Sequence, residues 1–432
     1  MAKRDFNLKY GKGTVSFSIP EEQILDVVWG KEYPALEDLE AAYLKALDHP
    51  IDAPPLKEVV KPGDTVAITV SDITRAWQKN YLTLPILINY LNAAGVPDEN
   101  ITIVIAVGGH RQNTEQECKE LCSEEVFNRV KVVNHDAWDT ENMVYLGKTS
   151  KGTEVSVNRI FTEADKVILT GGIIYHYMVG YGGGRKSIMP GIASIQTIRQ
   201  SHLWAMGREL GSGSNPRSAS KYTRGNECHE DMMEVAAFVN PDFIVNVVPN
   251  PEGDLAGVFA GNWISAWLHG TELVDEIYGI EIKEEADIVI ATAGGYPKDI
   301  NLYQTGKTMD NAYYAMKKDG VAIILSECPD IMEPEEFTQW FNYESTYEME
   351  KALRETFTIP GWVAFKEVEC GNKGPFVMLT KPENADFAKK ANLIPVTSIE
   401  EALKIAYEKC GTSNPKVTVM PQGANTFPIV LK

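Results

Sequence analysis

The feature that most constrains this chain is a repeated order of a short apolar run, a polar or glycine-rich loop and a helix. Five of the runs are rich in Val, Ile and Leu and lie between turn signals, at residues 65–70, 101–107, 130–134, 166–169 and 243–248. Apolar runs without alternation are typical of strands that are buried on both faces. Strand, loop and helix in this order predict an α/β fold with a doubly wound, mostly parallel sheet.

The length of the chain and a second group of strands predict two domains. At 432 residues the chain exceeds the size at which a single hydrophobic core keeps growing. A new α/β unit is expected to contain strands at residues 287–291, 321–325 and 376–379. We therefore expect an N-terminal domain over residues 1–280 and a C-terminal domain over residues 281–432. The segment 416–430 reads as a strand, and whether it returns to the N-terminal domain stays open.

Other elements follow from local patterns. Residues 6–20 alternate between apolar and polar positions around Gly11-Lys12-Gly13, which predicts a β-hairpin. Helices are expected at residues 36–47, 81–94, 115–121, 195–207, 263–278 and 312–318. Tyr303 to Lys307 has no such pattern and is expected to be a loop.

Composition limits the classes of partner. The chain has 41 basic and 60 acidic side chains, a net charge of −19, which disfavours binding to nucleic acid or to an anionic membrane surface. An anionic substrate must therefore find a local basic pocket. The six cysteines form no CxxC pair and are expected to be free thiols in a reducing compartment. With neither a signal peptide nor an apolar run of about 18 residues, we expect a cytoplasmic protein without a membrane span.

Polar side chains follow several of the predicted strands directly. Asp72, Ile73, Thr74 and Arg75 follow the first buried strand, and His110 follows the second in Gly-Gly-His-Arg. His176 lies beyond the strand that ends at Leu169. Ligands of open α/β sheets collect at the carboxyl ends of the strands, so these side chains could converge. Arginine suits a carboxylate or a phosphate, although Asp72–Arg75 could equally be a surface turn with an ion pair.

The loop around Lys186 is the densest cluster of such residues. Gly182-Gly183-Gly184-Arg185-Lys186-Ser187 looks like a phosphate-binding loop but lacks the GxxxxGK[ST] spacing, and a flexible turn is the plain alternative. A lysine in such a loop can anchor a nucleotide covalently as well as by charge. Single histidines are more often structural, but His110 and His176 at two strand ends favour proton transfer. For His202, on a predicted helix, a metal ligand is the sharper alternative to a core residue.

Taken together, these segments resemble the lactate racemase family, whose enzymes use a nickel-pincer nucleotide. The resemblance rests on the order and spacing of motifs from about residue 65 to residue 310: Asp72-Ile73-Thr74-Arg75, Gly109-His110-Arg111, His176 ten residues before Lys186, Pro190-Gly191, His202, and Tyr303-Gln304 with Lys307. It implies two α/β domains with the active site in the interdomain cleft, and a racemase or epimerase of a 2-hydroxy acid such as lactate.

The resemblance also implies roles for these residues. The cofactor, Ni(II)-pyridinium-3,5-bisthiocarboxylate mononucleotide, would be attached covalently to Lys186, with His202 as the nickel ligand from the protein. His110 and His176 would be the catalytic acid and base, and Asp72 to Arg75 would bind the nucleotide. Arg75, Gln304 and Lys307 would bind the substrate. The family further implies cofactor biosynthesis proteins as partners.

Two other classes of function remain as alternatives. A nicotinamide-dependent 2-hydroxyacid oxidoreductase is disfavoured because no GxGxxG follows an early strand with an acidic residue about 20 positions later. A non-catalytic sugar-acid or nucleotide-binding protein would not require two strand-end histidines together with a tethering lysine.

Overall fold

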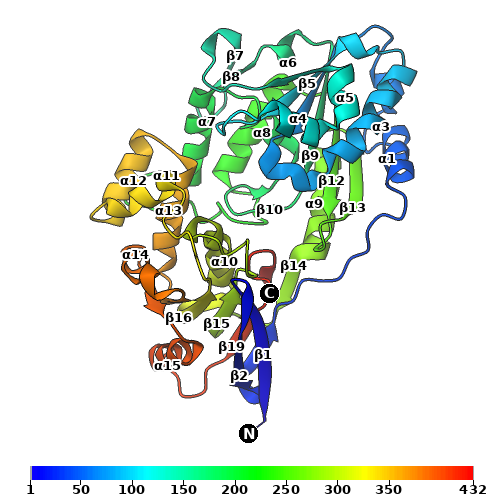
Figure 1. Ribbon diagram of the computed structural model, residues 1–432. Coiled ribbons are helices and arrows are strands. Elements are labelled where there is room, and N and C mark those ends of the chain that lie inside the picture. The colour runs from blue at the N-terminus through cyan, green and yellow to red at the C-terminus, as the bar shows by residue number, and fades with distance from the viewer. Residues whose placement is uncertain (1, 432) are drawn as a thin grey trace. The chain divides into compact units, whose positions relative to one another are not determined.

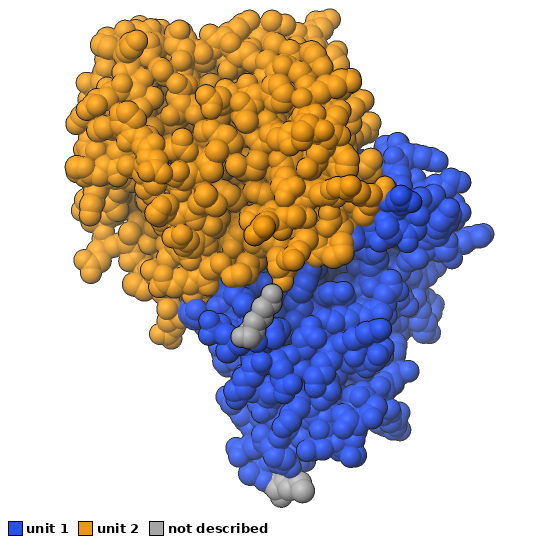
Figure 2. All heavy atoms as spheres, turned by 180° about the vertical axis from the view of Figure 1, so that it is seen from behind, with its two compact units in different colours: residues 1–31, 209–214, 278–432 blue, residues 32–208, 215–277 orange. Residues whose placement is uncertain are grey.

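The computed structural model describes residues 2–431 and divides into two compact units. Unit 1 contains residues 1–31, 209–214 and 278–432, and unit 2 contains residues 32–208 and 215–277, shown in blue and orange in Figure 2. Residues 1–31 therefore group with the C-terminal half, whereas the sequence had placed them with the N-terminal half. The reason is that the first three strands contribute to the sheet and core of unit 1.

Unit 2 is built on a six-stranded sheet in the order β13-β12-β9-β4-β5-β6 (Figure 1). Only β13 is antiparallel to its neighbour, so the predicted doubly wound, mostly parallel sheet is confirmed. Its strands are β4 (Val66–Ser71), β5 (Ile101–Ala106), β6 (Lys131–Asn134), β9 (Lys166–Gly172), β12 (Phe243–Pro249) and β13 (Leu255–Gly261).

One face of this sheet carries a core of Ile, Leu and Val. The cluster joins the strands to α1 (Leu39–Asp48), α2 (Leu56–Val59), α3 (Asn80–Ala93), α4 (Glu115–Cys122) and α5 (Glu124–Arg129). Local signals start these helices where the sequence has them: Asp38 caps α1, and Thr114 with Glu117 forms a capping box on α4.

The remaining elements of unit 2 follow β6 in the chain. They comprise two hairpins, β7 (Met143–Lys148) with β8 (Glu154–Asn158) and β10 (Tyr175–His176) with β11 (Gly180–Tyr181), and the helices α6 (Ile160–Glu163), α7 (Ile195–His202), α8 (Glu227–Val239) and α9 (Ser265–Tyr278). The predicted helix 195–207 ends earlier, because 3₁₀ turns follow α7 and then the chain becomes extended at Met206.

Unit 1 has a second six-stranded sheet, which is parallel throughout, in the order β18-β17-β16-β15-β19-β3. Its strands are β3 (Ile24–Val27), β15 (Ala286–Thr292), β16 (Met316–Leu325), β17 (Phe376–Leu379), β18 (Ile394–Val396) and β19 (Val417–Met420). The predicted hairpin is present as β1 (Lys3–Tyr10) and β2 (Gly13–Pro20).

The predicted last strand is two strands. β19 joins the sheet of unit 1, while β20 (Phe427–Val430) pairs in parallel with β14 (Gly279–Ile282). Both pairings lie within unit 1, which answers the question of where the end of the chain goes.

One helix prediction in unit 1 is wrong. The helix expected at residues 312–318 is α10 (Leu302–Ala315), and the segment Tyr303–Lys307 lies in its first turns instead of in a loop. The Asn301 side chain caps it by accepting from the Gln304 N–H at 3.0 Å. Residues 316–318 begin β16. The other helices of the unit are α11 (Glu335–Thr338), α12 (Thr346–Glu355), α13 (Ile359–Cys370), α14 (Ala385–Lys390) and α15 (Ile399–Lys409).

Candidate active site

The loop after β4 holds a histidine against a carboxylate. Asp72 caps the 3₁₀ turn that follows, accepting from the Thr74 N–H at 3.0 Å and from the Thr74 hydroxyl. Its other oxygen lies 2.5 Å from Nδ1 of His110. Burial alone would raise the pKa of Asp72, but the bonds and charges of His110, Thr74 and Arg75 outweigh burial and lower it. An ionised Asp72 fixes the proton of His110 on Nδ1 and leaves Nε2 as a base.

A second histidine meets a lysine instead of an acid. The Met178 N–H donates to Nδ1 of His176 at 3.2 Å, and Nε2 of His176 lies 2.9 Å from Nζ of Lys186. Since Nδ1 accepts, the ring proton sits on Nε2 and is donated to the lysine. A neutral amine accepts such a bond, so this geometry fits the uncharged, nucleophilic form of Lys186.

The electrostatics agree with that assignment. Lys186 and His176 are each partly exposed. Burial is nevertheless the largest cause of the pKa shift of both groups. Burial, with the charges of Arg185 and Arg75, lowers the pKa of Lys186 to about 7. Burial lowers the pKa of His176 well below its ordinary value, and the Lys186 ammonium, when protonated, lowers it further. In a chain with a net charge of −19, this is a locally basic site suited to an anionic ligand.

His202 is a buried imidazole with one ring nitrogen bonded to the backbone. It ends α7 and is 2% exposed, and its Nδ1–H donates to the Ile198 carbonyl at 2.8 Å. That bond orients the ring and leaves the lone pair on Nε2. Burial and the charge of Lys186 lower the pKa of His202 to about 4, so the ring is neutral. Residues 2–431 contain no group of three or more His, Cys, Asp or Glu that could hold a metal.

The glycines of the Lys186 loop serve packing within the chain. A Cβ on Gly183 would lie 2.7 Å from Oδ1 of Asn246, and one on Gly184 would lie 2.6 Å from the Trp267 ring. The Gly184 N–H donates to the same Asn246 oxygen at 2.9 Å, and the Trp267 indole donates to the Gly182 carbonyl at 2.9 Å. The loop is therefore a buried, fixed 3₁₀ turn and not the flexible turn that its composition allowed.

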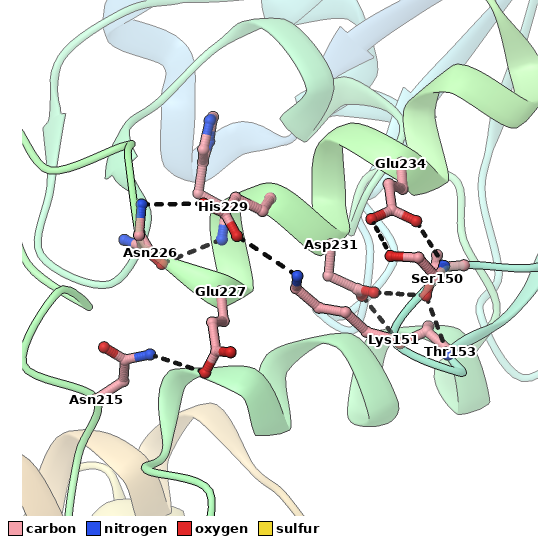
Figure 3. Close-up of polar contacts among 12 residues, drawn as sticks. Ser150, Lys151, Thr153, Asn215, Asn226, Glu227, His229, Asp231 and Glu234 are labelled. Carbon is pink, nitrogen blue, oxygen red and sulfur yellow. Dashed lines mark hydrogen bonds and ion pairs between the residues drawn. The ribbon is translucent and has the colours of Figure 1, made fainter.

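Helix α8 contacts this turn and is itself anchored by polar side chains, which Figure 3 shows. Asn226 caps it by accepting from the His229 N–H at 3.1 Å. The buried Asp231 accepts from the hydroxyls of Thr149 at 2.7 Å and Thr153 at 2.9 Å. Glu234 accepts from the Ser150 hydroxyl and N–H, both at 2.6 Å. The β7–β8 hairpin and α8 thus hold each other in place.

The structure brings most of the predicted site residues together. Within unit 2, Arg75 acts electrostatically on His176 and Lys186, and His110 acts on His202. Ile73 packs against the hydrophobic core instead of pointing to these groups. Gln304 and Lys307 belong to unit 1, where the lysine donates to the glutamine oxygen at 2.9 Å on α10. The catalytic, metal and substrate roles stay predictions.

Two buried residues of the site were missed in the sequence. Arg185 is 1% exposed, lies over the Trp267 ring at 4.6 Å and donates to the Val179 carbonyl at 2.7 Å. It was treated as part of a basic loop. Asn246 holds the glycine loop from the middle of the buried strand β12. A lone amide in an apolar strand was the available signal, since a buried amide needs a partner.

The fold and site define a class of protein before any comparison. The site lies at the carboxyl ends of parallel strands and combines neutral histidines, a lysine with a lowered pKa and nearby arginines. Such a combination is typical of enzymes that transfer protons on an anionic substrate. Models of the lactate racemase N-terminal and C-terminal domains match residues 10–213 and 282–427. The chain belongs to the lactate racemase family and is an isomerase of that kind.

Relatives of known activity match over nearly the whole chain. The lactate racemase of Thermoanaerobacterium thermosaccharolyticum is 33% identical over 98% of this chain and 99% of its own length. That of Lactiplantibacillus plantarum is 31% identical over 96% of this chain and 98% of its own length. Family membership favours an isomerase over the oxidoreductase and the binding protein weighed above.

Solved structures agree on the fold. The lactate racemase apoprotein from T. thermosaccharolyticum superposes with a TM-score of 0.87 at 32% identity, covering 99% of this chain and 100% of that one. A Thermotoga maritima protein matches with a TM-score of 0.64 at 18% identity, over 92% of this chain and 100% of that one, which shows the fold alone. No helix of residues 2–431 is long and apolar enough to cross a membrane.

Proposed function

We propose that the chain inverts the C2 centre of a 2-hydroxy acid, lactate or a related acid, by proton-coupled hydride transfer. The cofactor would be the nickel-pincer nucleotide, attached at Lys186, with His202 as the nickel ligand from the protein. When bound, it would supply the hydride acceptor that no ordinary side chain provides. Cofactor biosynthesis proteins would be needed as partners, and the cytoplasm is the proposed compartment.

The observation that carries the proposal is the contact between Lys186 and His176. A neutral amine beside a neutral imidazole is what a covalent anchor needs, because only the free base is a nucleophile. His202 supports it with a single neutral imidazole, whose Nδ1–H is held by the Ile198 carbonyl. Arg185 adds a buried guanidinium with no carboxylate hydrogen-bonded to it among the described residues, which favours a ligand of negative charge.

The chain's own residues would manage the protons and the substrate. His110, held by Asp72, presents Nε2 as a base toward the substrate hydroxyl. An amide-type nitrogen at Lys186 no longer accepts a hydrogen bond, so attachment there would release the Nε2–H of His176 to the substrate. Two histidines allow either enantiomer to be deprotonated, while Arg75, Gln304 and Lys307 would hold the substrate carboxylate.

The test uses protein from a host that makes the cofactor. The peptide containing Lys186 should carry extra mass, nickel should be near one atom per chain, and a chiral assay over a panel of 2-hydroxy acids should reveal the substrate. Lys186→Ala should lose the mass, the nickel and the activity. Lys166→Ala, whose lysine pairs with Asp242 at 3.0 Å, is the matched control. Full racemisation by Lys186→Ala would refute the proposal.

A further inference from the structure

One carboxylate of unit 2 collects three hydrogen bonds close to His176. Asp275 on α9 accepts from the hydroxyl of Tyr175 at 2.7 Å and from that of Tyr181 at 2.6 Å, both on Oδ1. Its Oδ2 accepts from Nζ of Lys221 at 2.7 Å. The proposed roles of the site residues do not explain why three side chains bind this carboxylate. The two tyrosines belong to the two strands of the hairpin that carries His176.

The register of that hairpin puts the tyrosines and the histidine on opposite faces. Tyr175 pairs with Tyr181 and His176 pairs with Gly180, and the two tyrosine rings lie 5.4 Å apart. Neighbouring side chains on a strand point to opposite sides, whereas cross-strand partners share a side. One face therefore binds Asp275 through both tyrosines, and the other presents His176 to Lys186.

The rest of the hairpin is tied through its backbone. Asn226 donates to the Met178 carbonyl at 2.9 Å, and the Lys221 N–H donates to the Gly180 carbonyl at 3.0 Å. A Cβ on Gly180 would lie 2.6 Å from the Tyr222 carbonyl oxygen, so this approach requires glycine. These bonds fix the turn, but they do not fix the rotation of the two-residue strands. The side-chain contacts with Asp275 hold both strands to α9, and the Trp267 indole of the same helix donates to the Gly182 carbonyl just beyond β11.

We propose that Asp275 is a positioning residue for His176, which it locates by binding Tyr175, Tyr181 and Lys221 of the neighbouring loop to α9. The proposal rests on the catalytic role of His176 in the proposed function. Displacing a catalytic group by about 1 Å can cost about a hundredfold in rate, so a side chain that touches no substrate can still control turnover.

The first experiment measures kcat and KM of the cofactor-loaded enzyme. Asp275→Ala should lower kcat about tenfold to a hundredfold with KM within about twofold, because the substrate-binding groups are untouched. Asp275→Asn keeps an oxygen for the phenols and should recover most of that loss. Glu272→Gln, on the same helix but exposed, is the matched control and should keep the wild-type rate. Equal rates for Asp275→Ala and wild type would overturn the proposal.

A double-mutant cycle separates positioning from general stability. Tyr175→Phe with Tyr181→Phe should lower kcat in the wild-type background and change it little once Asp275 is Ala, because the clamp is already gone. Independent losses multiply for residues that do not act together. Multiplying effects, or losses that track the melting temperature alone, would contradict a positioning role.

A second readout needs no cofactor. In the cofactor-free protein both ring nitrogens of His176 are engaged, so carbethoxylation by diethylpyrocarbonate, followed by mass spectrometry, should be slow at this histidine. Asp275→Ala should speed labelling of His176 several-fold and leave His135 unchanged, since the Ala193 carbonyl and Asn158 hold that ring. Faster labelling combined with an inactive wild-type holoprotein would uphold the clamp and refute the proposed function. Unchanged labelling would refute the clamp.

Discussion

Lys186 in unit 2 and Glu367 in unit 1 are ionisable groups of opposite kind whose pKa values are both shifted by burial. Around Lys186 in unit 2, burial pushes a lysine and two histidines toward their neutral, basic forms. In unit 1, burial raises the pKa of Glu367 on α13 well above its ordinary value. Glu367 is 3% exposed, and neither carboxylate oxygen has a hydrogen-bond partner among the described residues.

The difference lies in what can reach each group. Lys186 and His176 keep some accessible surface and face each other, so a ligand can take over their contact. Glu367 instead lies against the backbone of α10, where a Cβ on Gly306 would collide with its carboxyl. A neutral base that a ligand can reach can take part in a reaction. A neutral acid that no ligand can reach only destabilises the fold. A shifted pKa therefore marks a site only when access accompanies it.

The largest predicted effect comes from removing the bases themselves. His110→Ala and His176→Ala should each lower racemisation about 10²- to 10⁴-fold, the usual contribution of a general acid or base. The nickel content and the mass on the Lys186 peptide should stay at wild-type values, measured by metal analysis and mass spectrometry. A variant with the wild-type rate would remove that histidine from the mechanism.

Asp72→Asn should have the next largest effect. An amide cannot replace a carboxylate as the acceptor for Nδ1–H with the same strength, so His110 loses its preferred tautomer. We expect a fall of about 10- to 100-fold in kcat by chiral assay, smaller than for loss of the imidazole. Asp48→Asn, which removes a surface carboxylate paired with Lys57, is the control. Equal rates for both variants would mean that Asp72 does not orient His110.

The pH dependence of Lys186 sharpens the comparison further. With a pKa of about 7, the amine of the cofactor-free protein should react with trinitrobenzenesulfonate at a rate that rises through pH 7 and then levels off. A free lysine amine in the same reaction should keep reacting faster up to about pH 10. Mass spectrometry of the Lys186 peptide and of this reference amine over a pH series measures both rates. Parallel profiles would contradict a lowered pKa of Lys186.

The same shift has a consequence for stability. Between pH 7 and the ordinary lysine value, the unfolded chain binds a proton that the folded chain does not. This group should therefore make the cofactor-free protein more stable as the pH rises through that window, and Lys186→Met should remove that part of the slope in denaturant titrations.

The smallest effect is expected in unit 1. Glu367→Met should raise the free energy of unfolding at pH 8 by about 1 to 3 kcal/mol, the cost of a buried polar group without partners. Because the folded-state pKa of Glu367 is raised, its penalty appears above the unfolded value of about 4.3 and grows with pH. The gain should therefore shrink toward pH 4. A gain that is the same at both pH values would show that the pKa of Glu367 is not raised in the folded state.

The strands and the loop chemistry could be predicted from local patterns. The run 101–107 has too many consecutive Ile and Val residues for a surface strand, and it contains β5, a buried inner strand that lies between β4 and β6. The prediction of a loop at residues 303–307 was wrong because Thr305, Gly306 and Lys307 suggest no helix. The capping signal at Asn301 was overlooked. The burial of Arg185 was missed for another reason. No local sequence pattern distinguishes a buried arginine from an exposed one when a lysine follows it.

The sequence by itself determined the alternation of strands and helices, the family, and which side chains follow the strand ends, because these depend on residues close together in the chain. Only the tertiary structure decided that residues 1–31 join unit 1 and that Lys186 faces His176. It also decided that Asp275 binds the tyrosines of the hairpin that carries His176. Those contacts join segments far apart in sequence, and protonation depends on how much protein surrounds a group. The neutral lysine at the centre of the site is therefore a property of the fold.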